Sequence, residues 1–341
     1  MPRFSLLHQR VLRIHQEPCT FVSDAAVHAA LTARPAEYLD YVSKSLRRVA
    51  LGRLTVELPA KQVFTDSRGG DFRVMPCVVR GPRAVLKTVK VVGTNLAQRV
   101  VPDQITVGKL LVLHPLENFV THIVDACVLS SARTGVCAAL AVTLLARRRA
   151  RLTIVGAGRV GFYSGLYAAA AGVQRIAVWD SKRERADACV RALRAHLPRA
   201  EVNRAEFGPG HRADVVVLAT TSRAPVCRPP AWGADLIVSL GADTDRQSEL
   251  DRAWARCADI YVDAADTLRF GDLKAWITSG LLKEPEVVEL VDAARRPIAL
   301  RNDRPRLFVS TGSALFDNFT ISYLLHVRPV IGQARRRNPR T

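Results

Sequence analysis

The chain has 341 residues, of which 48% are hydrophobic and 24% charged, so it is neither disordered nor fibrous and is long enough for two domains. Its 50 Lys and Arg against 31 Asp and Glu give a formal charge of +19, which can attract nucleic acid or anionic ligands. The arginines are scattered, however, and their densest short cluster lies at the C-terminal residues 335–337 and 340. No aromatic interleaving and no nucleic-acid module accompany them, and we expect no nucleic-acid partner.

The 7 cysteines form no C-x-x-C pair, and most lie in apolar runs where a free thiol acts as a small hydrophobe. This usage favours a reducing compartment and argues against disulfides and a zinc site. The first residues lack the uninterrupted apolar stretch of a signal peptide, and no apolar run suggests a membrane span. We therefore expect a cytoplasmic protein with neither a metal nor a membrane partner.

After a strand or two, helical spacing of apolar residues predicts helices over 24–33, with Asp24 as the N-cap, and over 35–51. Residues 52–125 change character, because β-rich segments separated by turns follow one another. We expect a strand-dominated lobe, with strands over 54–58, 72–79, 84–92, 105–113 and 119–124.

Three cations of this lobe, Lys61, Arg73 and Lys87, are candidate substrate-binding groups. Lys87 and Lys90 lie on a segment otherwise made of apolar and small residues. Because lysine is rarely buried without a partner, a solvated strand lysine is the alternative for either of them.

A long apolar helix is predicted over 126–148, and Arg133 is its one charge before Arg147. An arginine at the start of an apolar helix is costly unless its guanidinium meets an anion. A carboxylate or phosphate ligand is one such partner. An intramolecular salt bridge to an aspartate such as Asp125 is the alternative.

The chain is organised around one segment that reads as strand, glycine turn, helix and strand. Gly156, Gly158 and Gly161 have the G-x-G-x-x-G spacing, in which the glycines allow a tight turn, close approach of a pyrophosphate and close helix packing. The free N–H groups of the helix start, where Arg159 and Val160 lie, then face the phosphates. We predict a Rossmann-type dinucleotide-binding unit, with an ordinary turn that binds nothing as the alternative.

Asp180 ends the second strand of this unit. A carboxylate at this position accepts the ribose hydroxyls of NAD and repels the additional phosphate of NADP. Lys182, Arg183 and Arg185 follow directly, and we interpret them as a solvated helix face rather than a phosphate site. NAD is therefore favoured over NADP as the cofactor.

Further elements extend the Rossmann pattern, with a helix over 186–197 and strands over 214–219, 235–240, 260–263 and 307–309. An amphipathic last helix over 313–326 is expected to pack back on the first lobe.

The ends of these later strands carry polar residues, and ligands bind beyond the carboxyl ends of strands in such sheets. Thr220, Thr221, Ser222 and Ser310 are therefore candidate cofactor contacts. Asp243 has a positional reason to take part in the chemistry, with capping of its own loop as the alternative.

Six segments together resemble the ornithine cyclodeaminase/mu-crystallin family, in the family's order: GGDFRVMP, KTVKVVGTN, LSSARTG, IVGAGRVG, SLGADTDRQSEL and VSTGSALFDN. The resemblance implies an α/β fold with a Rossmann NAD domain, residues 126–312. It also implies a smaller substrate-binding and dimerisation lobe, residues 1–125 with 313–341, and a homodimer. The implied reaction is hydride transfer at Cα of an L-amino acid or its imine.

The resemblance also implies roles for single residues. Lys87 matches the family lysine that binds the substrate carboxylate and polarises the imine region. Arg133 matches the arginine that clamps the same carboxylate, and Asp243 matches the acid/base aspartate of the cyclodeaminases. Lys61 falls one residue from a second carboxylate-binding arginine.

Arg73 departs from the family pattern, because the ornithine enzymes carry a glutamate there, suited to a side-chain amine. The Ser-Ala-Arg-Thr block is closer to the diaminopropionate-pathway dehydrogenases of the family. We therefore expect an NAD-dependent amino-acid or imine dehydrogenase in diaminopropionate or siderophore-type biosynthesis. A redox-neutral ornithine cyclodeaminase and a mu-crystallin-like binding protein are the alternatives.

Overall fold

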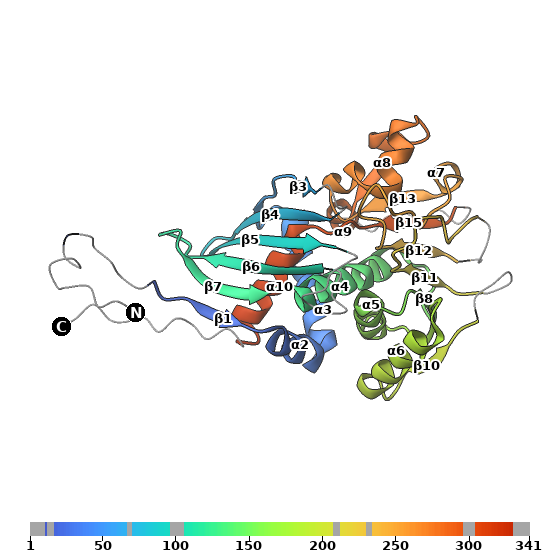
Figure 1. Cartoon of the computed structure of the whole chain (residues 1–341), viewed down its shortest axis with the longest axis horizontal. Helices are drawn as coiled ribbons and strands as arrows, with labels where there is room; N and C mark the ends of the chain where they lie inside the picture. The colour runs from blue at the N-terminus through green and yellow to red at the C-terminus, as the bar shows by residue number, and fades with distance from the viewer. Residues whose placement is uncertain are drawn as a thin grey trace.

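The structure, a computed structural model, describes residues 11, 17–66, 70–95, 106–206, 212–229, 234–295 and 304–329. Two sheets lie on opposite sides of the molecule with helices between them (Figure 1). The protein is therefore of the predicted α/β class, a Rossmann-type sheet joined to a second lobe. The C-terminal arginine cluster lies outside the described residues.

The first lobe is built on a seven-stranded sheet in the order β1-β7-β6-β5-β4-β2, with β3 paired to β4. β1 runs parallel to β7, and the other neighbours are antiparallel. β3 was not among the predicted strands. The strands are β1 Thr20–Val22, β2 Thr55–Glu57, β3 Gln62–Thr65, β4 Asp71–Arg80, β5 Val85–Thr94, β6 Thr106–Leu113 and β7 Val120–Asp125.

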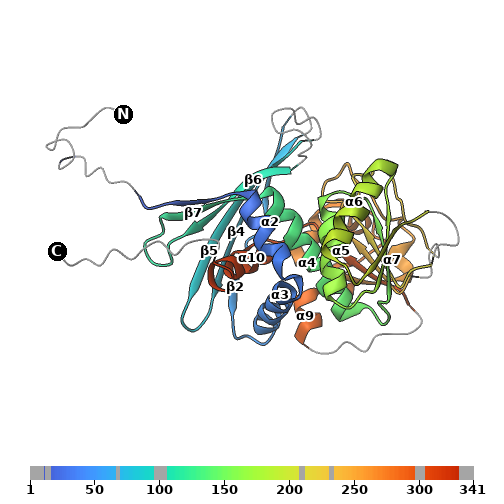
Figure 2. The same cartoon turned by 90° about the horizontal axis from the view of Figure 1, so that it is seen from below.

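Helices cover one face of this sheet (Figure 2). α10 (Ala314–His326) packs against β4 and β5, and α3 (Pro35–Ala50) packs beside it. α2 (Asp24–Ala33) packs on α3 and β7. Ser23, one residue before the predicted Asp24, caps α2 by accepting a hydrogen bond from the Ala26 N–H. α10 does pack on the first lobe, but it is buried on nearly all sides, so its predicted amphipathic character is wrong.

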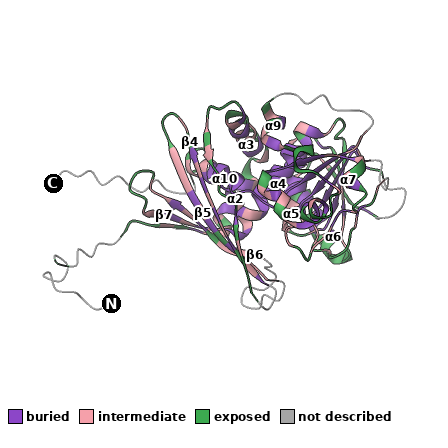
Figure 3. Ribbon diagram, turned by 90° about the horizontal axis from the view of Figure 1, so that it is seen from above, coloured by how far each residue is buried: buried purple, intermediate pink, exposed green. Residues whose placement is uncertain are grey.

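α4 (Cys127–Leu145) runs between the two sheets and is buried along most of its length (Figure 3). By length and composition alone it could cross a membrane, so the statement that no apolar run suggests a span is wrong for this segment. Its surroundings explain the composition, because α4 packs on α5, α2, α3 and α10 within the protein. It is a helix of the protein core.

The second sheet has eight strands, all parallel to their neighbours, in the order β10-β9-β8-β11-β12-β15-β13-β14. The strand order reverses between β8 and β11, which is where ligands bind in doubly wound sheets. The strands are β8 Arg151–Val155, β9 Arg175–Trp179, β10 Glu201–Arg204, β11 Val215–Leu218, β12 Leu236–Ser239, β13 Asp259–Val262, β14 Val287–Glu289 and β15 Arg306–Val309.

The helices that flank this sheet include the predicted pair after β8 and β9. The helical segments are α5 Arg159–Ala170, α6 Arg183–His196, α7 Trp254–Cys257, η1 Ala265–Arg269, α8 Gly271–Thr278, η2 Glu284–Glu286 and α9 Leu290–Arg295.

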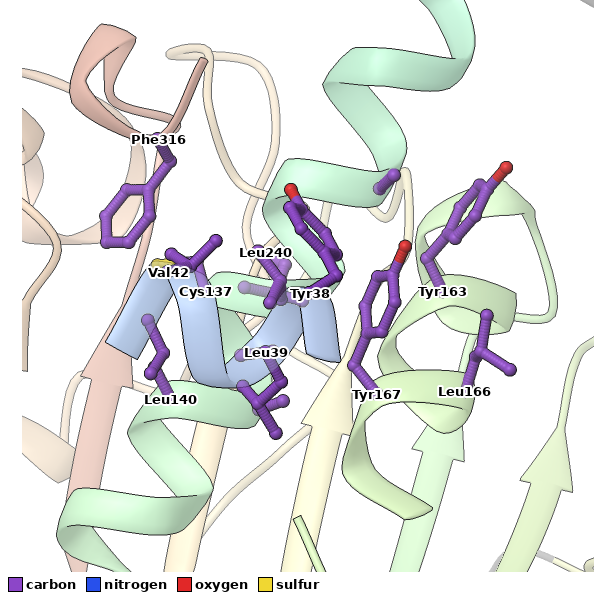
Figure 4. Close-up of a cluster of buried hydrophobic side chains, with 14 of the residues drawn as sticks. Tyr38, Leu39, Val42, Cys137, Leu140, Tyr163, Leu166, Tyr167, Leu240 and Phe316 are labelled. Atoms are coloured by element: carbon purple, nitrogen blue, oxygen red, sulfur yellow. The ribbon is translucent and has the colours of Figure 1, made fainter. Parts of the chain in front are cut away.

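The two lobes share one apolar core (Figure 4). The ring of Tyr38 in α3 meets that of Tyr167 in α5 edge-on, with centroids 5.3 Å apart, and its hydroxyl bonds to Thr320 of α10 at 2.6 Å. Removing a fully buried large aromatic side chain costs about 3–5 kcal/mol. This packing holds the carboxyl ends of the second sheet close to the first lobe. The domain boundaries at residues 126 and 313 remain our proposal.

Candidate functional site

The glycine turn between β8 and α5 has the geometry of a dinucleotide site. Gly156 has a φ of 102°, a conformation that favours glycine. A Cβ on Gly161 would lie 2.2 Å from the Gly156 carbonyl oxygen, so glycine is required for this close packing. A Cβ on Gly158 would meet nothing within 4 Å, which leaves open space at the start of α5. The turn therefore fits a pyrophosphate, which the N–H groups of Arg159 and Val160 would face.

Asp180 follows β9 and lies beside this turn. Its carboxylate accepts hydrogen bonds from the N–H groups of Ala157 at 2.8 Å and Lys182 at 2.9 Å. An adjacent pocket is lined by Asp180, Arg183 and Arg204, among others. Arg183 thus contributes to a pocket as well as to the solvated face that we expected. Asp180 both orders the turn and keeps lone pairs for ribose hydroxyls.

Glu249 joins the carboxyl ends of β11 and β12. Its fully buried carboxylate accepts hydrogen bonds from N and Oγ1 of Thr220, at 2.7 and 2.9 Å. It accepts two more from Ser239 Oγ and the Gly241 N–H, at 2.7 and 2.9 Å. Burial raises the pKa of this carboxyl group. Glu249 therefore fixes the loop after β11 relative to the loop that carries Asp243.

The predicted hydroxyl residues at the strand ends are largely engaged within the protein. Thr220 donates to Glu249, Ser222 Oγ donates to the Ala224 carbonyl at 2.6 Å, and Ser310 Oγ donates to Asp263 at 2.6 Å. Thr221 is exposed. These residues stay candidate cofactor contacts, chiefly through the shape and backbone groups of their loops.

Asp243 follows β12 and is held by Arg73 from the other lobe. Arg73 Nη1 donates to Asp243 Oδ2 at 2.6 Å, while Nε and Nη2 donate to the carboxylate of Asp71 at 2.9 and 3.1 Å. Arg73 is buried, whereas 31% of the Asp243 side chain is exposed. Arg73 therefore contacts the acid/base candidate directly, and part of the Asp243 carboxylate stays accessible.

Lys61 lies in the same electrostatic cluster. Its Nζ donates to the carbonyl oxygen and to Oγ1 of Thr311, both at 2.9 Å, and lies 4.0 Å from the centroid of the Phe270 ring. Burial and the nearby Arg73 lower the pKa of Lys61 to about 8. Thr311 directly follows Ser310 at the end of β15, so Lys61 reaches the carboxyl edge of the second sheet from the first lobe.

Lys90, Arg133 and Asp317 form a buried triad. Lys90 Nζ lies 2.7 Å from Asp317 Oδ2, and Arg133 Nε lies 3.1 Å from Asp317 Oδ1. Burial and Arg133 lower the pKa of Lys90. Arg133 Nη1 is buried and has no hydrogen-bond partner among the residues that the structure describes. Since an unpaired buried donor is costly, a carboxylate ligand at Nη1 would stabilise the site.

The partner of Arg133 is thus Asp317 rather than the suggested Asp125, which pairs with Lys109. Gly312 makes room for the guanidinium. Its φ is 86°, and a Cβ there would lie 2.5 Å from Nη2 and 2.6 Å from Nη1 of Arg133. A side chain at Gly312 would therefore displace Arg133.

Lys87 does not lie in this site, which corrects the sequence-based assignment. Its Nζ donates to the Asn118 side chain at 2.5 Å near the turn between β6 and β7. Side chains alternate between the faces of a strand, so Lys87 and Lys90, three residues apart on β5, point to opposite faces. Thr88, Lys90 and Val92 face the helices and are buried. Lys90, rather than Lys87, therefore lies with Arg133 and Asp317 in the buried triad.

Three acidic site residues were not predicted: Asp71, Glu249 and Asp317. All three lie inside segments that carry the family resemblance, and all three are largely buried. Carboxylates are almost never fully buried without partners. An acidic residue within a segment that carries the family resemblance could therefore have been recognised from the sequence as a candidate site residue.

Fold and site together define a two-lobed α/β protein with a dinucleotide-binding domain and a buried cation cluster between the lobes. The chain belongs to the ornithine cyclodeaminase/mu-crystallin family, whose sequence model matches residues 20–323. It is 28% identical over 291 residues to the Δ1-pyrroline-2-carboxylate reductase of Paracoccus denitrificans, covering 81% of this chain and 89% of the relative. It is 29% identical to the L-lysine cyclodeaminase of Streptomyces rapamycinicus, covering 82% of each chain.

A solved structure extends the comparison. The Thermococcus litoralis Δ1-pyrroline-2-carboxylate reductase in complex with NADH and L-proline superposes with a TM-score of 0.78, at 21% identity, over 90% of this chain and 98% of that one. The relatives are reductases, dehydrogenases and cyclodeaminases, and this protein is an enzyme.

Proposed function

We propose that this enzyme uses NAD to move a hydride to or from Cα of an L-amino acid or its imine. The observation that carries the proposal is the buried Nη1 of Arg133, which has no hydrogen-bond partner within the described part of the chain, in a guanidinium that lies beside Lys90. These two cations match the α-carboxylate that every such substrate carries. The reductase and cyclodeaminase relatives support the same chemistry.

Each site residue has a task in this reaction. When bound in the glycine turn beside Asp180, the cofactor would supply the hydride acceptor as NAD and the hydride donor as NADH. Arg133 and Lys90 hold the carboxylate, which orients Cα relative to the cofactor edge of the second sheet. Asp243 takes a proton from the substrate ammonium and gives it back in the reverse direction, a step worth about 10²- to 10⁴-fold in rate.

The proposal is tested by a screen of L-amino acids and imines with NAD or NADH, followed by absorbance and mass spectrometry. Wild type is expected to turn over at least one of them, and Arg133→Met is expected to lose turnover while still binding NADH. Wild-type activity in Arg133→Met would show that this arginine is structural. A wild type that binds NADH but converts no substrate would favour the mu-crystallin-like binding protein instead.

A redox-neutral cyclodeaminase is the second candidate, favoured by the similarity to the lysine cyclodeaminase. That reaction would retain the imine, add a side-chain amine to it and lose ammonia. Mass spectrometry of products formed from ornithine or lysine without accumulation of NADH distinguishes it. A role in diaminopropionate or siderophore-type biosynthesis would follow from a substrate of that pathway.

We also propose a homodimer through the face of the first sheet that the helices leave open. Phe21, Phe72 and Val91 on this face are 59%, 48% and 39% exposed, and Leu111 and Ile123 lie among them. A contiguous exposed apolar patch typically marks an interaction surface. Light scattering should give a dimer mass for wild type and a smaller mass for Val91→Glu, and a monomeric wild type would contradict the proposal.

The cytoplasm remains the proposed location, supported by seven free cysteines.

A further inference from the structure

A chain of hydrogen bonds crosses from the first lobe to the carboxyl end of β15 and on to the end of β13. Lys61 Nζ donates to Thr311 Oγ1 at 2.9 Å, and the Oγ1 atoms of Thr311 and Thr267 lie 3.0 Å apart. Thr267 Oγ1 in turn donates to Asp263 Oδ1 at 2.5 Å. Because an ammonium only donates and a carboxylate only accepts, the direction of the chain is fixed, and the Thr311 hydroxyl donates to Thr267.

Asp263, which follows β13, is the buried end of this chain and is 4% exposed. Its Oδ1 also accepts from the Ala264 N–H at 3.0 Å, and its Oδ2 accepts from Ser310 Oγ at 2.6 Å. One carboxylate thus joins η1, through Thr267, to the end of β15, through Ser310. Since a buried polar group without its partner costs free energy, this arrangement resists displacement of either hydroxyl.

Residues 310–312 are therefore held from both lobes. Lys61 Nζ also donates to the Thr311 carbonyl oxygen at 2.9 Å, from the side of the first lobe. From the second sheet, Thr267 Oγ1 accepts from the Thr311 N–H at 3.4 Å. Within the segment, the Gly312 N–H donates to Ser310 Oγ at 3.2 Å. The backbone of this segment has little freedom to move.

The segment ends against the guanidinium of Arg133. A Cβ on Gly312 would lie 2.5 Å from Nη2 and 2.6 Å from Nη1 of Arg133. Asp317 contacts the same guanidinium at Nε, 3.1 Å away. Gly312 therefore limits where the two Nη atoms can lie, and Nη1 is the donor that we assign to the substrate carboxylate.

We propose that Asp263 and Thr267 are positioning residues for Arg133 and act on it through residues 310–312. The inference rests on the proposed function, because it takes Arg133 as the group that binds the carboxylate. A guanidinium binds a carboxylate best through two parallel hydrogen bonds, which require a defined orientation of its fork. A displacement of about 1 Å at such a contact can cost about 10²-fold in rate.

Thr267→Val and Thr267→Ser are a matched pair of variants, because valine keeps the shape of threonine without its hydroxyl and serine keeps the hydroxyl. The first test compares crystal structures of both variants and wild type, each with NADH. Residues 310–312 and the Arg133 guanidinium should shift by about 1 Å in Thr267→Val and stay in place in Thr267→Ser. An unmoved guanidinium in Thr267→Val would overturn the inference, whether or not a substrate has been found.

Kinetics with the substrate from the screen give the second test. Thr267→Val should lower kcat/KM about 10²-fold while NADH binding stays near wild type, and Thr267→Ser should restore most of the activity. In an Arg133→Lys background, where the fork is already lost, the effect of Thr267→Val should largely disappear. Equal losses in both backgrounds would show a merely structural role and overturn the inference.

The outcomes separate this inference from the proposed function. A wild type that converts no substrate, together with a shifted guanidinium in Thr267→Val, would overturn the function and leave the positioning of Arg133 in place. If Thr267→Val does not fold, Ser310→Ala takes its place with the same expected results, because it removes the other hydroxyl that Asp263 binds.

Discussion

Lys90 and Lys87 offer a matched pair of substitutions on one strand, with opposite expected results. Lys90 Nζ lies 2.7 Å from Asp317, and each side chain is 1% exposed. Truncating one partner of a buried charge pair costs about 2–5 kcal/mol. At 1.36 kcal/mol per factor of ten, Lys90→Met should therefore lower kcat/KM roughly 30- to 5,000-fold.

Lys87→Met should change kcat/KM by no more than about twofold, because exposed substitutions usually stay within ±0.5 kcal/mol. Steady-state kinetics with the substrate from the screen measures both variants, and NADH binding by fluorescence shows that each is folded. If Lys87→Met lost activity and Lys90→Met kept it, the placement of Lys90 in the carboxylate site would be refuted.

Four further outcomes are expected. Asp243→Asn should bind NADH normally and lose single-turnover hydride transfer by about 10²- to 10⁴-fold, whereas a loop-capping residue would lower the melting temperature with little loss of rate. Glu249→Gln leaves a buried donor unpaired, which costs about 1–3 kcal/mol, and it should weaken both NADH binding and hydride transfer. Asp272→Asn is the control, because Asp272 accepts hydrogen bonds from Ser248 and from the backbone of the same segment, and this variant should lower stability alone. The folded state lowers the pKa of Lys61 from 10.5 to about 8, so between these pH values the folded chain binds fewer protons than the unfolded chain. The free energy of unfolding in urea of wild type, relative to that of Lys61→Met, should therefore rise from pH 8 to 10.5. NAD should bind at least tenfold better than NADP, about 1.4 kcal/mol, and equal dissociation constants would remove the role given to Asp180.

The glycine turn could be predicted from the sequence because its requirements are local. Gly156 is needed for its backbone conformation and Gly161 for a close contact with Gly156, both within six residues of chain. The strand, the helix and Asp180 follow from the same short segment. Most elements of both sheets were similarly visible from apolar patterns, with boundaries shifted by a residue or a few.

The carboxylate site could be predicted only in part, because its geometry depends on register and on distant partners. β5 carries apolar residues on both faces, so alternation gave no sign that Lys90 rather than Lys87 points inward. Asp317 reaches Arg133, and Asp243 reaches Arg73, across the lobes, and no local pattern encodes such a pairing. Arg73 was proposed from the sequence as a site residue, but its hydrogen bond to Asp243 could be found only in the structure.

The proposed reaction transfers a hydride directly between Cα and the nicotinamide. The most direct measurement uses an L-amino acid deuterated at Cα, chosen from the screen, in a single turnover with the enzyme and NAD. Mass spectrometry of the cofactor should find the deuterium in NADH, and Arg133→Met should form almost none. NADH without deuterium, or substrate that loses its deuterium to water while NAD stays oxidised, would contradict the account.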